Sequence, residues 1–206
     1  MKSDALIILD WDDTLFPTTW TVKNRINLSD KDTKERYIVY FSQLDNLLYK
    51  LLSAFMEHGT IFVVTNAMVK WVLVSADILP HTKRLLQSKI QIISAREKHG
   101  KEIPNDMFEW KRLIFKNLVS KYYLDNSSQN IISVGDADYE FRALVDLWNK
   151  HHKRRILKTV KFMPSPSFDA LIDQLEVLAS SVPHICKTTK HMDLRFNDVR
   201  DKVKGY

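Results

Sequence analysis

The chain has 206 residues, of which 45% are hydrophobic and 27% charged, with a formal net charge of +6. This length fits one domain with a sizeable core, and no apolar run approaches the length of a membrane span. The lone Cys186 excludes an internal disulfide and is typical of a reducing compartment. The N-terminal apolar run, residues 5–9, is too short for a secretory signal. We therefore expect a cytoplasmic protein, although delivery into a host cell by a dedicated secretion machine would leave no such mark.

Short apolar runs alternate along the chain with helical patterns. The apolar runs predict strands at residues 5–9, 60–64, 90–94, 131–134 and 156–163. Apolar residues spaced by three and four predict helices at residues 44–58, 69–79, 108–123, 140–151 and 167–181. Strands that alternate with helices predict an α/β, Rossmann-like fold with a central parallel sheet and helices on both of its faces.

Polar side chains follow several of the predicted strands, at the edge where ligands of open parallel sheets bind. Asp10 and Asp12 are two residues apart, so both side chains can point to one side of this edge, and Asp136 follows another strand. Mg²⁺ prefers such oxygen ligands, often together with a substrate phosphate. Thr65 and Asn66 would add hydrogen-bond donors for that phosphate. The pattern therefore predicts a magnesium and phosphate site.

Four motifs in chain order resemble those of the haloacid dehalogenase superfamily. Residues 10–14, Asp-Trp-Asp-Asp-Thr after an aliphatic strand, are similar to its first motif, Asp-x-Asp-x-Thr. Thr65 resembles the second motif, and residues 135–140, Gly-Asp-x-x-x-Glu, resemble the fourth. The third motif is a lone lysine on a helix, and Lys111 matches it best. The alternative candidates for this lysine are Lys101, Lys116 and Lys121.

The resemblance implies a phosphatase that works through an aspartyl-phosphate. Asp10 would attack phosphorus, and Asp12 would protonate the leaving oxygen and then deprotonate the hydrolytic water. Mg²⁺ would be held by the Asp10 carboxylate, the Asp12 backbone carbonyl and Asp136. Thr65 and Lys111 would bind the phosphoryl group, and either Glu140 or Asp138 would orient the waters on the metal.

Residues next to these motifs have less specific interpretations. Trp11 either packs in the core, which is favoured, or forms an aromatic wall that binds substrate. Asp13 is expected to be solvated or to cap the turn, and the Thr14 hydroxyl to bond the local backbone. Trp71 is expected to be buried, and Arg96 is expected to form a surface ion pair rather than touch substrate.

Members of the superfamily often carry a cap domain, inserted after the first motif or between the second and third. Residues 15–43 leave room for a flap or a short helix but not for a folded cap. Between Thr65 and Lys111, one helix, one strand and a loop use up the chain. We therefore expect residues 1–182 to form a domain with a flap-only cap and an open cleft. Residues 183–206 read as a charged helical extension that could continue into a longer protein.

An open cleft admits a phosphorylated side chain on a macromolecule. The chain resembles cap-less relatives, eukaryotic-type and bacterial effector phosphatases, that dephosphorylate proteins. Five aromatic residues near the expected entrance would either flank a phosphotyrosine ring or pack the flap. They are Phe16, Trp20, Tyr37, Tyr40 and Phe41. The leading hypothesis is a monomeric, Mg²⁺-dependent phosphatase of phosphorylated protein or peptide, with phosphotyrosine favoured.

Other functions stay open at this point. A small-molecule or nucleotide phosphatase would use the same residues. A receiver-type phosphoacceptor module combines similar residues, but there the lysine ends a strand, whereas Lys111 lies in a helical pattern. A catalytically inactive scaffold is disfavoured because every motif residue is present.

Part of the positive charge gathers in residues 150–161, Lys-His-His-Lys-Arg-Arg-Ile-Leu-Lys-Thr-Val-Lys. The plainest interpretation is a solvated helix end followed by an edge strand. A sharper interpretation is attraction to an anionic membrane surface or to anionic substrates. No basic stretch with interspersed aromatic residues and no zinc-ligand spacing supports nucleic acid, so we rank that partner last.

Overall fold

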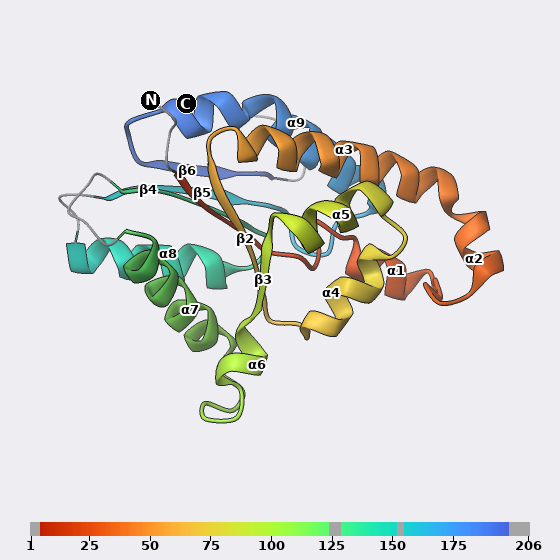
Figure 1. Cartoon of the computed structure of the whole chain (residues 1–206), viewed down its shortest axis with the longest axis horizontal. Coiled ribbons are helices and arrows are strands. Elements are labelled where there is room, and N and C mark those ends of the chain that lie inside the picture. The colour runs from red at the N-terminus through yellow and green to blue at the C-terminus, as the bar shows by residue number, and fades with distance from the viewer. Residues whose placement is uncertain (1–4, 124–128, 152–154, 198–206) are drawn as a thin grey trace.

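The computed structural model describes residues 5–123, 129–151 and 155–197 (Figure 1). In these ranges six strands form one sheet in which every pairing is parallel, in the spatial order β3-β2-β1-β4-β5-β6. The strands are β1 (Ala5–Leu9), β2 (Gly59–Thr65), β3 (Gln91–Ser94), β4 (Gln129–Gly135), β5 (Arg155–Lys161) and β6 (Met192–Arg195). The predicted α/β class is confirmed, and all strands except β6 lie within two residues of their predicted bounds.

Helices cover both faces of the sheet, as Figure 1 shows. On one face lie α3 (Ile38–Met56), α5 (Pro80–Ser88) and α9 (Phe168–Lys187), and on the other lie α7 (Met107–Tyr122) and α8 (Asp138–His151). Side chains of β1 alternate between two cores, with Ile7 and Leu9 in one and Leu6 and Ile8 in the other. None of the helices in the described ranges is both long and apolar enough to cross a membrane.

The strand order reverses beside β1. From β1 the chain adds β2 and then β3 on one side, and it returns to place β4 on the other side of β1. Strands β1 and β4 stay paired to their ends, where the Asp10 N–H donates to the Val134 carbonyl at 2.9 Å. Their following loops then diverge, which leaves the crevice typical of ligand sites in such sheets. Asp10 and Asp136 therefore leave the sheet at this switch point.

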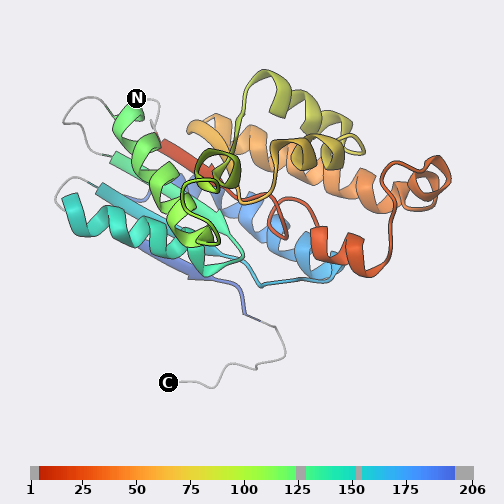
Figure 2. The same cartoon turned by 90° about the horizontal axis from the view of Figure 1, so that it is seen from below.

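The flap segment, residues 15–43, folds into two short helices and the start of a third. They are α1 (Thr18–Lys23), α2 (Lys31–Arg36) and the first turns of α3, which begins six residues earlier than predicted. Figure 2 shows α1 beside the N-terminal end of α9. The Trp20 ring lies 5.0 Å from the Phe168 ring of α9 and 5.7 Å from the Tyr37 ring, measured between centroids. These contacts hold the flap on the main body.

The flap aromatics mainly pack rather than line an entrance. Phe16 and Phe41 are completely buried, and their rings stack at 6.0 Å. Trp20 and Tyr37 are partly buried within the same cluster, while Tyr40 is 43% exposed. The Tyr40 ring still packs, at 5.6 Å from the Trp20 ring and 5.1 Å from the Phe168 ring between centroids. Of the two interpretations of these residues, packing of the flap holds for all five.

The predicted helical extension at residues 183–206 is wrong. Residues up to Lys187 complete α9, and the chain then returns to add β6 in parallel beside β5. The reason is a two-residue alternation, in which Met192 and Leu194 pack against the core while Asp193 and Arg195 are exposed. Residues 198–206 lie outside the described ranges.

The basic stretch at residues 150–161 does not present its described cations freely to solvent. The Arg155 guanidinium donates to the Leu147 carbonyl at 2.6 Å, and the Lys158 ammonium, fully buried, donates to the Ile185 carbonyl at 2.5 Å. Lys161 pairs with Asp138 at 2.9 Å. The expectation of a solvated basic surface is therefore wrong for residues 155–161, and residues 152–154 lie outside the described ranges.

Candidate functional site

A buried ion pair lies at the switch point. The Lys111 ammonium of α7, 1% exposed, lies 3.0 Å from Oδ1 of Asp10, which follows β1. This Oδ1 atom has the ion pair but no hydrogen bond of good geometry. Lys101, Lys116 and Lys121 are exposed. Lys111 is therefore the lysine that meets Asp10, as the sequence predicts.

Glu140 of α8 is the second partner of this lysine. Its Oε1 accepts a hydrogen bond from Lys111, and its Oε2 is buried with no hydrogen-bond partner in the described ranges. Gly135 makes the approach possible, because a Cβ atom there would lie 2.5 Å from Cγ and Cδ of Glu140. The resemblance implies that either Glu140 or Asp138 orients metal-bound waters. In the structure Glu140 pairs directly with Lys111, and Asp138 pairs with Lys161.

The site carries more negative than positive charge. If all are ionised, the buried carboxylates of Asp10 and Glu140 and the half-buried carboxylate of Asp136 outnumber the buried Lys111 cation. The Lys161 ammonium donates to the Asp136 backbone carbonyl at 3.0 Å, but its carboxylate partner is Asp138. Burial raises the pKa of Asp10 well above its usual range, although Lys111 opposes this shift. Burial, Glu140 and Asp13 together raise the pKa of Asp136 to about 7. An added cation would lower the free energy of this cluster.

The pKa of Lys111 is also raised, which for an ammonium favours the charged form. Burial by itself lowers the pKa of the Lys111 ammonium, but Asp10 and Glu140 outweigh burial and raise this pKa above its usual value. Lys111 therefore remains charged throughout the physiological pH range.

The Asp12 carboxylate is held by donors from three elements. Its Oδ1 accepts from the Thr18 hydroxyl at 2.6 Å and from the Trp71 indole N–H at 2.7 Å, and its Oδ2 accepts from the Thr65 hydroxyl at 3.2 Å. Thr18 begins α1, Thr65 ends β2, and Trp71 lies on α4 (Val69–Ala76). These bonds fix the side chain of Asp12, which is two positions after Asp10 in the sequence.

Sequence reasoning did not find the roles of Thr18 and Trp71. Trp71 was expected simply to be buried, whereas it is partly exposed with its indole N–H on Asp12. Thr18 and Trp71 lie six and fifty-nine residues from Asp12, and both lie outside the motif of residues 10–14, so the motif does not identify them.

The turn after β1 is held by Asp13 rather than by Thr14. Asp13 adopts a left-handed backbone with φ of 53°, and its Oδ1 accepts from the Thr19 N–H at 2.8 Å, in the first turn of α1. Asp13 is buried rather than solvated, and its carboxylate caps the first turn of α1 rather than the turn in which it lies. The Thr14 hydroxyl is also buried and has no hydrogen-bond partner in the described ranges, so its predicted backbone bond is wrong.

Trp11 and Asn66 occupy different surroundings. Trp11 is completely buried, stacks on Phe16 and donates from its indole to the Ser75 hydroxyl at 2.9 Å. The favoured interpretation of Trp11, packing in the core, is therefore confirmed, and the alternative of an aromatic wall that binds substrate does not hold for its side chain. Asn66 is partly exposed at the end of β2, and its amide lies 3.4 Å from the Met107 carbonyl at the start of α7.

The residues present fit a magnesium ion. Groups of three or more His, Cys, Asp or Glu side chains that could hold a metal are absent from the described ranges. The predicted set, however, needs only the carboxylates of Asp10 and Asp136 and the Asp12 carbonyl, which are all oxygen donors. The excess negative charge and the unpartnered Glu140 Oε2 are consistent with a cation at this point.

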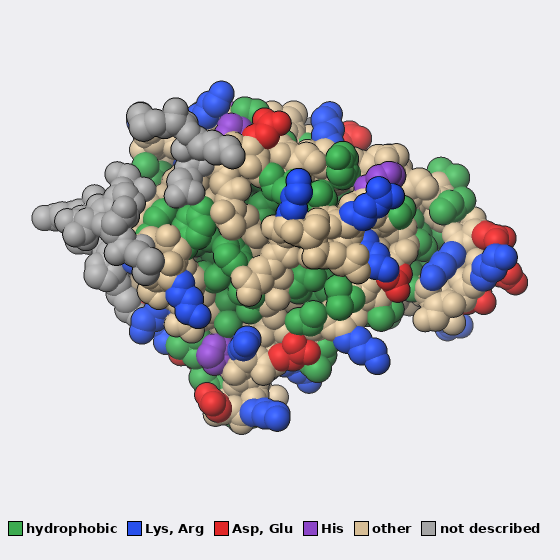
Figure 3. All heavy atoms as spheres, in the orientation of Figure 1, with side chains coloured by type: hydrophobic (Ala, Val, Ile, Leu, Met, Phe, Trp, Pro, Cys, Tyr) green, Lys and Arg blue, Asp and Glu red, His purple; other side chains and the backbone are tan. Residues whose placement is uncertain are grey.

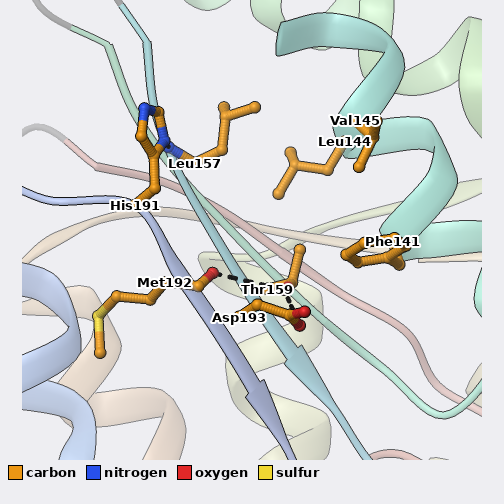
Figure 4. Close-up of a pocket in the computed structure, with 8 residues that line it drawn as sticks. All are labelled: Phe141, Leu144, Val145, Leu157, Thr159, His191, Met192 and Asp193. Carbon is orange, nitrogen blue, oxygen red and sulfur yellow. Dashed lines mark hydrogen bonds between the residues drawn. The ribbon is translucent and has the colours of Figure 1, made fainter.

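A different pocket lies away from these residues. A cavity of ≈ 530 Å³ opens between α8 and the β5–β6 edge of the sheet, and Figure 4 shows its lining. Its walls are mainly apolar side chains such as Phe141, Leu157 and Met192. It contains none of Asp10, Asp12 or Lys111, so it lacks the chemistry of the switch-point site.

Comparisons of the chain with protein-family models, with curated proteins and with solved structures return no match.

Replacing Lys111 with Met should destabilise the protein by about 3–5 kcal/mol, because two buried carboxylates lose their counter-charge. Urea unfolding followed by circular dichroism measures this loss at neutral pH. Lys116→Met, on the exposed side of the same helix, is the matched control. The double variant Lys111→Met/Glu140→Gln should lose less stability than Lys111→Met. Equal stability of the Lys111→Met and Lys116→Met variants would contradict the buried ion pair.

Proposed function

We propose that this chain is a Mg²⁺-dependent phosphatase that hydrolyses phosphomonoesters through an aspartyl-phosphate. The observation that carries the proposal is Asp10 at the switch point, buried against Lys111, with the Asp12 carboxylate held beside it by three donors. A nucleophile and a separate acid–base group, placed together at the ligand-binding edge of a sheet, suit two-step phosphoryl transfer.

In the first step, a carboxylate oxygen of Asp10 attacks the phosphorus atom. An O–P bond forms as the bond between phosphorus and the ester oxygen breaks, and protonated Asp12 donates its proton to that leaving oxygen. Lys111 holds the Asp10 side chain in place and favours its ionised form, which burial alone would disfavour.

In the second step, water attacks the phosphorus of the aspartyl-phosphate. Asp12, now ionised, takes a proton from this water, and the bond between Asp10 and phosphorus breaks to release inorganic phosphate. The Thr65 hydroxyl and the Trp71 indole hold the ionised Asp12 carboxylate for this task.

A bound Mg²⁺ would supply charge neutralisation of the phosphoryl oxygens. Its protein ligands would be the Asp10 and Asp136 carboxylates and the Asp12 carbonyl. Lys111, which pairs with Asp10, would supply a second, fixed positive charge.

The substrate that we favour is a phosphorylated side chain of a protein or peptide, with phosphotyrosine first. Between Asp12 and α3 the chain forms only the short helices α1 and α2. Met68 before α4 and Met107 at the start of α7 are 46% and 44% exposed, which offers apolar contact area near the end of β2.

The alternative functions predict different kinetics. A small-molecule or nucleotide phosphatase would use the same residues but hydrolyse a metabolite far better than any phosphopeptide. A receiver-type phosphoacceptor would keep its phosphoryl group; here the candidate lysine lies on helix α7 rather than at a strand end, and Asp10 follows the first strand of the chain.

Replacing Asp10 with Asn should abolish turnover, by at least about 1,000-fold in kcat, because Asn cannot form the acyl-phosphate. The assay compares phosphotyrosine peptides, phosphoserine peptides and phosphorylated metabolites in Mg²⁺ buffer. Asp32→Asn, an exposed change on α2, is the control and should leave turnover intact. Beryllofluoride should inhibit the natural chain. Normal activity of a folded Asp10→Asn variant would end the nucleophile assignment.

Asp136→Asn should weaken Mg²⁺ binding about 10-fold or more, because the site loses an anionic ligand. Isothermal titration with MgCl₂ measures this affinity without substrate, and the Mg²⁺ dependence of hydrolysis should shift in parallel. Asp173→Asn, an exposed change on α9, provides the matched control. Unchanged Mg²⁺ affinity in the Asp136→Asn variant would refute the ligand assignment.

Asp12→Asn should cause the phosphoenzyme to accumulate on aryl phosphates. Phenols with a pKa of about 10 leave with little help from an acid, whereas water attack still needs Asp12 as base. Trp71→Phe keeps the ring but removes the N–H donor, and we expect a smaller slowing of the same step. Acid quench with a ³²P-labelled substrate measures the trapped fraction. If the Asp12→Asn variant forms the phosphoenzyme but hydrolyses it as fast as the natural chain does, so that none accumulates, the role of Asp12 as base is contradicted.

A further inference from the structure

A second cavity is lined by residues close in sequence to those of the candidate site. It has a volume of ≈ 480 Å³ and lies between α6 (Ala95–His99), the loop that follows it and the start of α7. Trp110, Pro104 and Met68 supply apolar surface, while Arg96, Lys101 and Glu97 supply charge. In Figures 1 and 2, α6 and its loop project from the edge of the sheet where β3 ends.

Two chain segments connect this cavity to the catalytic residues. Met68 is three residues beyond Thr65, and Trp110 immediately precedes Lys111. The Asn66 amide also contacts the Met107 carbonyl, which ties the end of β2 to the start of α7. A substrate bound at Asp10 would therefore have its neighbouring residues within reach of the cavity.

The loop that forms the cavity is held by hydrogen bonds within the protein. The Ile103 N–H donates to the His99 carbonyl at 2.9 Å, and the Trp110 indole donates to the Ile103 carbonyl at 2.6 Å. Asn105, with a left-handed φ of 62°, turns the chain back towards α7. Because its walls are fixed before a ligand arrives, the cavity would lose little entropy on binding.

The cations of the cavity have no partner of their own. Arg96 and Lys101 are exposed, and neither side chain forms an ion pair or a hydrogen bond in the part of the chain that the structure describes. The expected surface ion pair of Arg96 is therefore absent from those ranges. Glu97 lies on the same wall, so the three side chains together carry one net positive charge. Figure 3 shows basic side chains and an acidic side chain at the lower tip of the molecule, where this loop lies.

We propose that this cavity is a specificity subsite that binds an acidic residue flanking the phosphorylated residue of a peptide substrate. The proposal rests on the phosphatase function proposed above. Arg96 and Lys101 pair with the carboxylate, while Met68, Pro104 and Trp110 contact the aliphatic part of the bound segment. The net charge of +6 of the whole chain favours the approach of such acidic segments.

The test uses phosphotyrosine peptides that differ only in whether glutamate or lysine flanks the phosphorylated residue, on either side. Since exposed ion pairs contribute about 0.2–1 kcal/mol each, the natural chain should prefer the glutamate peptide about 5-fold in kcat/KM at low salt. This preference should shrink as salt increases. The variant Arg96→Glu/Lys101→Glu should reverse it. Lys98→Glu, on the same helix but lining a different cavity, is the matched control and should keep the preference.

The same labelled peptides are also tested by fluorescence anisotropy, so that binding is measured whether or not hydrolysis occurs. If the natural chain hydrolyses no phosphoester but binds the glutamate peptide through Arg96 and Lys101, the phosphatase proposal fails and the subsite stands. If hydrolysis occurs with equal kcat/KM for both peptides, or if the double variant keeps the natural preference, the subsite proposal is overturned. Binding to phosphatidylserine vesicles through the same two cations, without any peptide preference, overturns it as well.

Discussion

The buried lysine between two carboxylates is the interaction on which the rest of the candidate site depends. Lys111 is 1% exposed and lies between Asp10 and Glu140, so its contacts join α7 to the end of β1 and to α8. A buried charge without partners would cost several kcal/mol, so these three residues constrain one another. Gly135 is part of the same constraint, because the Glu140 side chain occupies the space that a Cβ atom would need.

That constraint leaves the site short of positive charge, and the proposed chemistry depends on this shortage. Asp10 and Asp136 both have raised pKa values because burial and neighbouring carboxylates disfavour their ionised forms. A divalent cation and a phosphoryl group would use this surplus, the cation by neutralising it and the phosphoryl group by reacting with Asp10. Asp12 lies beside the buried pair but has its own donors, among them Thr18 of α1 and Trp71 of α4.

In the proposed function, catalysis and specificity would come from different parts of the fold. The candidate residues Asp10 and Asp136 follow β1 and β4, which are central strands, and Lys111 of α7 contacts Asp10. The proposed subsite lies on α6 and its loop, at the margin of the sheet beside β3. This separation would allow the preference for residues that flank the phosphorylated residue of a peptide to change through Arg96 and Lys101, while Asp10 and Lys111 keep their geometry.

The sequence by itself determined the parallel sheet and most strand positions, because apolar runs and the polar residues that end them are local signals. The meeting of Asp10 with Lys111 was implied only by the resemblance of four motifs to those of a known superfamily, which left three other lysines as alternatives. The sequence could not identify β6, which forms only because β5 offers a free edge to a short alternating segment. Nor could it show that Trp71 bonds Asp12 across fifty-nine residues, or that Glu140 pairs with Lys111. Only the tertiary structure decided these contacts, because each depends on how distant elements pack and not on the residues beside it.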